Sequence, residues 1–173
     1  NFSLGVTNLA GILALDGDLD AFDLLSKSEL RDDPVVTSFN WLMSFKPYPE
    51  LKFNRWAMFD FAIENTAPNR VCYEFGVWMG SSLKYLMKNF DYGYGFDTFS
   101  GLPEQWGREE KGSYSSFGMI PNIPNVEFVV GRFEDTLKDF FSEKRPKAGI
   151  INFDADLYSS TLCALINAHD VID

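Results

Sequence analysis

The fold of this chain is decided by one stretch of its sequence, Cys72-Tyr73-Glu74-Phe75-Gly76-Val77-Trp78-Met79-Gly80-Ser81-Ser82. The apolar run in this stretch breaks off into glycines. A second apolar run breaks off into carboxylates, in Ile151-Asn152-Phe153-Asp154-Ala155-Asp156-Leu157-Tyr158. Strands of a parallel sheet that is buried on both faces read as such runs, and ligands bind at the carboxyl ends of these strands. We therefore expect the glycines and the carboxylates to share one rim of a sheet.

Strand-like and helix-like segments alternate from residue 71 onward. The pattern predicts strands over 71–76, 92–97, 126–130 and 148–154, and helices over 80–90, 133–143 and 158–170. Strands joined by helical crossovers form right-handed parallel units, so we expect an α/β fold with a Rossmann-like three-layer parallel sheet over residues 67–173. The connection over 100–125 is rich in glycine and proline, and its length is typical of a lid or of a disordered segment.

The first 66 residues are expected to form a helical and irregular segment that covers the core. Residues 1–33 predict two short helices joined by a polar turn. The segment Asp16-Gly17-Asp18-Leu19-Asp20 resembles the start of a calcium loop, but Ala21 and Lys27 stand where that loop needs a glycine and a glutamate, which argues against calcium binding. Aromatic residues alternate with prolines over 34–54, which predicts an irregular segment packed on the core and able to roof a pocket. Residues 55–66 have a helical pattern.

The composition restricts the partners of the chain. Its 173 residues carry 25 acidic and 15 basic side chains, a formal net charge of -10, which argues against nucleic acid and anionic membranes as partners. Cys72 and Cys163 form neither a CxxC pair nor a disulfide framework, which favours a reducing compartment. Because no apolar stretch reaches the roughly 20 residues that span a bilayer and no leader is recognisable, we expect a cytoplasmic protein.

The loop after the first predicted strand favours a ligand with a cationic head. A dinucleotide site needs the pattern G-x-G-x-x-G, and Trp78 stands at the position of its second glycine, which disfavours a nicotinamide-dependent oxidoreductase. Glu74 is able to meet the ammonium group of S-adenosylmethionine (SAM), while Gly76 and Gly80 let the backbone approach the ligand closely. Asp97 ends the next strand, where a carboxylate can accept hydrogen bonds from both hydroxyls of a ribose.

Each of these residues also has a purely structural interpretation. The two glycines would allow a tight turn from strand to helix, and the serine after them would be an N-terminal helix residue. Glu74 would form an ion pair with Arg70 or Arg132. Asp156 would cap the following helix, and His169, far along that helix, would be a surface residue.

Four motifs follow one another between residue 71 and about residue 165. They are Glu74-Phe75-Gly76-Val77-Trp78, Gly95-Phe96-Asp97-Thr98-Phe99-Ser100-Gly101-Leu102-Pro103-Glu104, Gly131-Arg132-Phe133-Glu134-Asp135-Thr136-Leu137 and Asp154-Ala155-Asp156-Leu157-Tyr158-Ser159-Ser160-Thr161. This set resembles the macrocin O-methyltransferase family, class I SAM-dependent enzymes that methylate sugar hydroxyls in bacterial natural products. Residues 1–54 match no motif of the family.

The resemblance assigns a role to each motif. It implies that the methionine moiety of SAM is lined by Glu74, Gly76, Gly80 and Ser81. It implies that Asp97 holds the ribose and that Arg132 and Phe133 border the adenine. The remaining cofactor contacts would come from Val77, Trp78, Thr98 and Asp154. Asp154 would also bind a divalent metal, most often magnesium (Mg2+), and Asp154 or Asp156 would accept the proton of the acceptor hydroxyl.

The family pattern continues beyond Asp173 with an acidic pair of metal ligands and with the last strands of the sheet. Because the chain also begins at Asn1 rather than at methionine, we expect a fragment whose last strand lies at a sheet edge. The resulting hypothesis is a metal-assisted O-methyltransferase that acts on a hydroxyl of a sugar or other small natural product, with a homo-oligomer as a further possibility. The alternative is an inactive fragment or a non-catalytic domain that binds SAM or a nucleotide.

Overall fold

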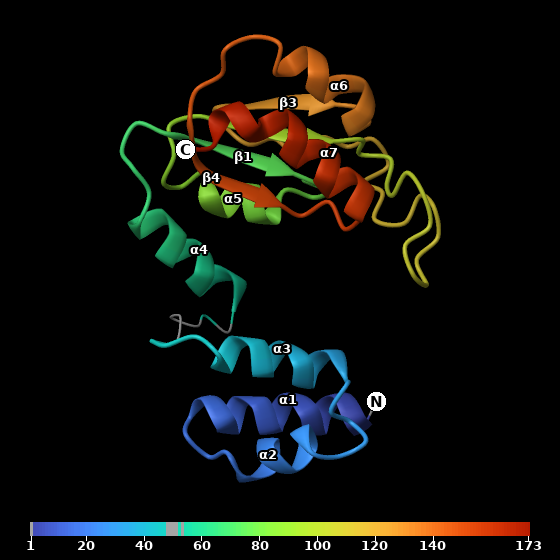
Figure 1. Ribbon diagram of the computed structural model, residues 1–173. Coiled ribbons are helices and arrows are strands. Elements are labelled where there is room, and N and C mark those ends of the chain that lie inside the picture. Colours follow the sequence, from blue (N-terminus) through green and yellow to red (C-terminus); the bar gives the residue numbers. More distant parts are fainter. Residues whose placement is uncertain (1, 48–51, 53) are drawn as a thin grey trace. The chain divides into compact units, whose positions relative to one another are not determined.

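The computed structural model describes residues 2–47, 52 and 54–173, and these fall into two compact units that divide after Lys52 (Figure 1). Expectations that concern Tyr48, Pro49 and Phe53 lie outside the described residues. The first unit contains α1 (Phe2–Leu15), α2 (Asp20–Ser26) and α3 (Pro34–Met43). Its core is formed by Ala10, Ala14, Phe22 and Val36. In the described part of the chain, no helix combines the length and the apolar character that crossing a membrane requires.

Helix α3 corrects the prediction of an irregular segment over residues 34–54. The Asp33 side chain caps this helix by accepting a hydrogen bond from the Val35 amide at 2.9 Å, and Pro34 occupies the first helical turn. Proline is favoured there because the first helical amides have no partner within the helix. The prediction is therefore wrong for residues 34–43, whereas the packing of this segment on the core stays a prediction.

The second unit is built on a sheet of four parallel strands, as predicted. They are β1 (Val71–Phe75), β2 (Gly93–Asp97), β3 (Val126–Val130) and β4 (Ala148–Phe153), and their order in the sheet is β3-β2-β1-β4. Strand β1 therefore pairs on both sides, and β4 lies at an edge. The carboxyl ends of β1, β2 and β4 meet at one rim of the sheet.

Helices cover both faces of this sheet and complete three layers (Figure 1). Helices α4 (Arg55–Glu64) and α5 (Ser81–Leu86) pack on one face, and α6 (Phe133–Phe140) and α7 (Tyr158–Ala168) pack on the other. Cys72 belongs to the core of the first face and Tyr73 to that of the second, because successive side chains of a strand alternate. Since Phe59 of α4 lies in the first core, the unit begins before this helix and not after residue 66.

Stacked aromatic rings fix the register of the sheet next to the rim. The ring of Phe75 in β1 stacks on Phe96 of β2 at 4.6 Å and on Phe153 of β4 at 5.3 Å between centroids. These residues are direct neighbours in the parallel ladders. Aromatic pairs contribute beyond their buried area, so this row stabilises the three strand ends that carry the rim.

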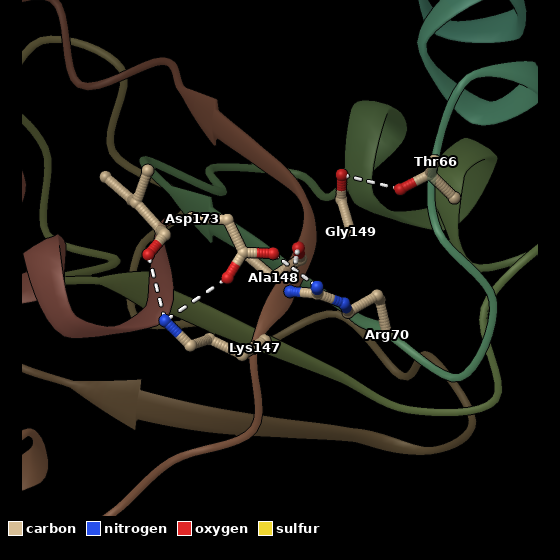
Figure 2. Close-up of polar contacts among 7 residues, drawn as sticks. Thr66, Arg70, Lys147, Ala148, Gly149 and Asp173 are labelled. Carbon is tan, nitrogen blue, oxygen red and sulfur yellow. Dashed lines mark hydrogen bonds and ion pairs between the residues drawn. The ribbon is translucent and has the colours of Figure 1, made fainter.

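A polar network holds the opposite, amino end of β4 (Figure 2). Asp173 forms ion pairs with Arg70 and with Lys147, the latter at 3.3 Å. The hydroxyl of Thr66 donates to the carbonyl of Gly149 at 2.7 Å. These contacts tie the segment after α7 and the segment before β1 to the start of the edge strand.

Candidate active site

Two adjoining hollows open at the carboxyl ends of the strands. The loop hollow lies between the loop 98–114 and the start of α6, and the helix hollow lies along the starts of α4 and α5. Both are lined by Gly76, Trp78, Tyr114, Asp154 and Asp156. The glycines after β1 and the carboxylates after β4 were predicted to share one rim, and Gly76 with the two aspartates confirms this.

The structure places nearly all of the predicted cofactor residues in these hollows. Asp97, Thr98, Arg132 and Phe133 line the loop hollow; Val77 and Ser81 line the helix hollow. Glu74 and Gly80 line neither hollow. Gly80 precedes α5 with a φ of 77°, and a Cβ there would meet Pro121 at 2.9 Å and Ile123 at 3.1 Å. The structural interpretation of Gly80, a tight turn from strand to helix, therefore agrees with its position.

Gly76 permits a close approach between the ends of β1 and β4. Its φ is 91°, and a Cβ at this position would collide with the carbonyl oxygen of Asp154 and meet the Ala155 Cα at 3.0 Å. The Asp154 amide donates to the Phe75 carbonyl at 2.8 Å just before this point. A side chain at position 76 would force the Asp154 backbone away from β1, and with it the carboxylates of the rim.

The carboxylate of Asp97 organises the loop after β1. One of its oxygens accepts hydrogen bonds from the amides of Val77 and Trp78, and the other accepts from the amide of Phe99, all at 2.7 Å. A carboxylate offers about four acceptor positions, so about one is left for a ligand, whereas the sequence suggested two ribose hydroxyls. The sequence did not reveal this structural role of Asp97.

Glu74 is buried beneath the rim with 1% of its surface exposed. Asn152 of β4 donates to its Oε1 at 2.6 Å, while its Oε2 has no hydrogen-bond partner among the described residues. Burial raises the pKa of Glu74 to about 8, with the Asn152 hydrogen bond acting against the rise and the Asp154 charge adding to it. Glu74 is therefore mostly neutral at pH 7, and a cationic group placed beside it would favour release of its proton.

Neither arginine that was considered as a partner of Glu74 pairs with it. Arg70 pairs with Asp173, and Arg132 pairs with Glu134 at 2.7 Å. The interpretation of Glu74 as an ion-pair partner of either arginine is therefore wrong.

Asp154 and Asp156 both face the two hollows. Asp154 Oδ2 lies 3.7 Å from Nη1 of Arg55, the first residue of α4. The pKa of Asp156 is raised, first by its partial burial and then by the Asp154 charge. Helix α7 has Leu157 at its N-cap and no side-chain cap, so Asp156 does not cap this helix. His169 is exposed at the end of α7, as predicted.

The rim does not by itself make a magnesium site. In the part of the chain that the structure describes, no group of three or more His, Cys, Asp or Glu side chains is arranged to hold a metal. The two rim carboxylates stand beside a guanidinium group, which competes with a cation for Asp154. The residues present therefore do not fit Mg2+ on their own.

Sequence reasoning missed a group of aromatic side chains at the helix hollow. Trp56, Trp106 and Tyr114 line it beside Trp78, and each of the four is between 42% and 50% exposed. Trp78 and Tyr114 meet edge to face at 6.2 Å. Large aromatic residues inside a long loop rich in glycine and proline were the available signal for Trp106 and Tyr114.

Of the comparisons with known proteins, the one with solved structures bears on the fold. No protein-family model matches the chain, and no curated protein matches it. Among solved structures, the crystal structure of CalS11, a calicheamicin methyltransferase, is 18% identical with a TM-score of 0.55, over 87% of this chain and 70% of that one. The apo structure of CalS11, described as a TDP-rhamnose 3'-O-methyltransferase of calicheamicin biosynthesis, is 20% identical with a TM-score of 0.50, over 84% and 79% of the two chains. The second unit of this chain therefore has an α/β Rossmann-like fold that resembles these solved structures. Membership of the macrocin O-methyltransferase family stays a prediction.

The buried Glu74 predicts a specific dependence of stability on pH. Between pH 4.5 and about 8 the folded chain keeps a proton on Glu74 that the unfolded chain has released, so the free energy of unfolding falls as pH rises through this window. We expect a loss on the order of a few kcal/mol. In Glu74→Gln this component should vanish, as measured by chemical denaturation at several pH values. Equal slopes for both proteins would contradict the assignment.

Asp97 predicts a combined effect on folding and binding. Asp97→Asn keeps one acceptor oxygen but turns an NH2 group toward backbone amides, so we expect a loss of about 1–3 kcal/mol in the free energy of unfolding, and a larger loss in Asp97→Ala. Both variants should bind S-adenosylhomocysteine more weakly in calorimetry. Asp91→Asn, at an exposed position, is the matched control and should change neither quantity. If both Asp97 variants keep the stability and the affinity of the parent, Asp97 neither organises the loop nor binds the ligand.

Proposed function

We propose that the chain is a SAM-dependent O-methyltransferase that acts on a hydroxyl group of a sugar or other small natural product. The observation that carries this proposal is the position of Asp154 and Asp156 where the two hollows meet. One hollow offers groups for a nucleoside, and the other offers aromatic walls for an acceptor. A carboxylate at their junction is placed to take a proton from the acceptor.

The loop hollow would hold the nucleoside part of SAM. The remaining acceptor capacity of Asp97 suits a ribose hydroxyl, and Arg132 with the buried ring of Phe133 would border the adenine. The amino-acid tail would lie past Gly76 toward Ser81, above Glu74. When bound, SAM supplies an electrophilic methyl group on its sulfonium sulfur.

The helix hollow would hold the acceptor. Its exposed tryptophan and tyrosine rings offer apolar faces with polar edges, a lining typical of small-molecule sites with few polar groups. Such faces suit the flat apolar faces of a sugar ring. The description of one CalS11 structure as a TDP-rhamnose 3'-O-methyltransferase supports a sugar as acceptor here. A cytoplasmic location and a homo-oligomer remain predictions.

Asp156 is the better proton acceptor of the two rim carboxylates. Arg55 lies beside Asp154, whereas no basic side chain pairs with Asp156 among the contacts of the described residues. Partial burial and the Asp154 charge raise the pKa of Asp156, which makes it a stronger base than an ordinary aspartate. Asp156 would remove the hydroxyl proton, while the walls of the two hollows align the acceptor oxygen with the methyl group. Alignment of this kind lowers a barrier by several kcal/mol.

Magnesium assistance, with Asp154 as a ligand, stays a prediction from the resemblance. Two carboxylates beside Arg55 do not support it, so no step of the proposed mechanism passes through a metal. Turnover that survives a strong chelator would remove the metal from the reaction.

Ligand binding is the experiment that tests the proposal most directly. We expect S-adenosylhomocysteine and SAM to bind and to raise the melting temperature, because Asp97, Gly76 and Glu74 match a nucleoside with an amino-acid tail. NAD should have no effect, since Trp78 occupies the glycine position that a pyrophosphate needs. Calorimetry and thermal shift measure both. Stabilisation by NAD alone would overturn the proposal.

Asp156→Asn tests the mechanism. Asp156 has a φ of 59°, a conformation that asparagine tolerates, so the backbone of the rim should be preserved. We expect methyl transfer to a panel of sugars and nucleotide sugars to fall by about 100-fold or more, with unchanged affinity for S-adenosylhomocysteine. Parental turnover in this variant would exclude Asp156 as the base. Binding without turnover by the parent chain would favour the non-catalytic alternative.

A further inference from the structure

Arg55 connects three segments at the edge of the helix hollow. It is the first residue of α4, and its Nη1 donates to the hydroxyl of Ser82 in the first turn of α5 at 3.3 Å. The same nitrogen lies 3.7 Å from Asp154 Oδ2 after β4. The Arg55 side chain is half exposed and lines the helix hollow.

The carboxylate in the amino-acid tail of SAM needs a cationic partner in the helix hollow. The amino-acid tail of SAM carries an ammonium and a carboxylate. Asp154 and Asp156 line this hollow and would repel the carboxylate of the tail. Among the described residues that line the helix hollow, Arg55 is the one cationic side chain.

The surroundings of Arg55 suit a carboxylate. A guanidinium has five donors in a planar fork that matches the two oxygens of a carboxylate. The hydroxyl of Ser82 accepts from Arg55, which leaves its own proton free to donate, and Ser81 lines the same hollow. The ion pair with Asp154 is partly exposed and therefore weak, so it is readily shared with a ligand.

We propose that Arg55, together with the hydroxyls of Ser81 and Ser82, binds the α-carboxylate of the amino-acid tail of SAM. This inference rests on the proposed function and extends it to a residue outside the four motifs. In this arrangement the tail lies with its ammonium group toward Glu74 and its carboxylate toward α4. Helix α4 thereby contributes directly to cofactor binding.

The test compares two ligands that differ only in the carboxylate. S-adenosylhomocysteine carries it, and the decarboxylated analogue, 5'-deoxy-5'-(3-aminopropylthio)adenosine, keeps the ammonium group and lacks it. Calorimetry on the whole chain should show that Arg55→Met binds S-adenosylhomocysteine about tenfold or more weakly and the analogue within about twofold of the parent. Since both ligands carry the ammonium, any effect of Arg55 on Glu74 cancels in this comparison.

Control variants separate binding from structure. Arg55→Lys keeps the charge but not the fork and should lie between the parent and Arg55→Met for S-adenosylhomocysteine. Arg31→Met removes an exposed arginine from the first unit and should change neither affinity. Thermal unfolding should show that the Arg55 variants remain folded, because the side chain is half exposed.

The outcomes distinguish this inference from the proposed function. Equal losses for both ligands would mean that Arg55 only shapes the hollow, and no loss for either would assign it to another group, such as an anionic acceptor. Either result overturns the inference and leaves the proposed function standing. If the parent chain binds neither ligand, the proposed function fails first and the inference fails with it.

Discussion

The site depends on the pairing of β1 with a parallel strand on both sides. Because β2 and β4 flank β1, the carboxyl ends of three strands reach the same rim. The stacked rings of Phe75, Phe96 and Phe153 stabilise these strand ends side by side. Gly76 then lets the chain leave β1 against the backbone of Asp154. This close contact brings the loop after β1 next to the carboxylates of Asp154 and Asp156 after β4.

Four carboxyl groups lie at or beneath the rim, and each has a different environment. Glu74 is buried and mostly protonated at neutral pH, and Asp97 accepts hydrogen bonds from three backbone amides. Asp154 stands beside Arg55, and Asp156 keeps a raised pKa in the field of Asp154. Four acids close together would otherwise repel one another strongly. The four carboxyl groups therefore differ in burial, in hydrogen bonding and in the charges beside them.

Much of the architecture could be read from the sequence. Apolar runs that end in glycines or carboxylates identified β1 and β4, and the alternation of strands and helices gave the parallel three-layer fold. These signals are local and depend on burial alone. Helix α3 was missed although its start signal was present, because Pro34 was taken as a loop residue and not as the first residue of a capped helix. A helix over residues 55–66 was predicted, whereas the sequence pattern did not show that it belongs to the second unit.

The sequence by itself determined which residues end the strands, and therefore which side chains lie at the rim. It could not determine what those side chains contact. The hydrogen bonds from the Val77 and Trp78 amides to Asp97, the packing of Gly80 against Pro121 and Ile123, and the approach of Arg55 to Ser82 and Asp154 join residues far apart in the chain. Contacts of this kind leave no periodic signal, because they depend on distances between elements that only the packed tertiary structure sets.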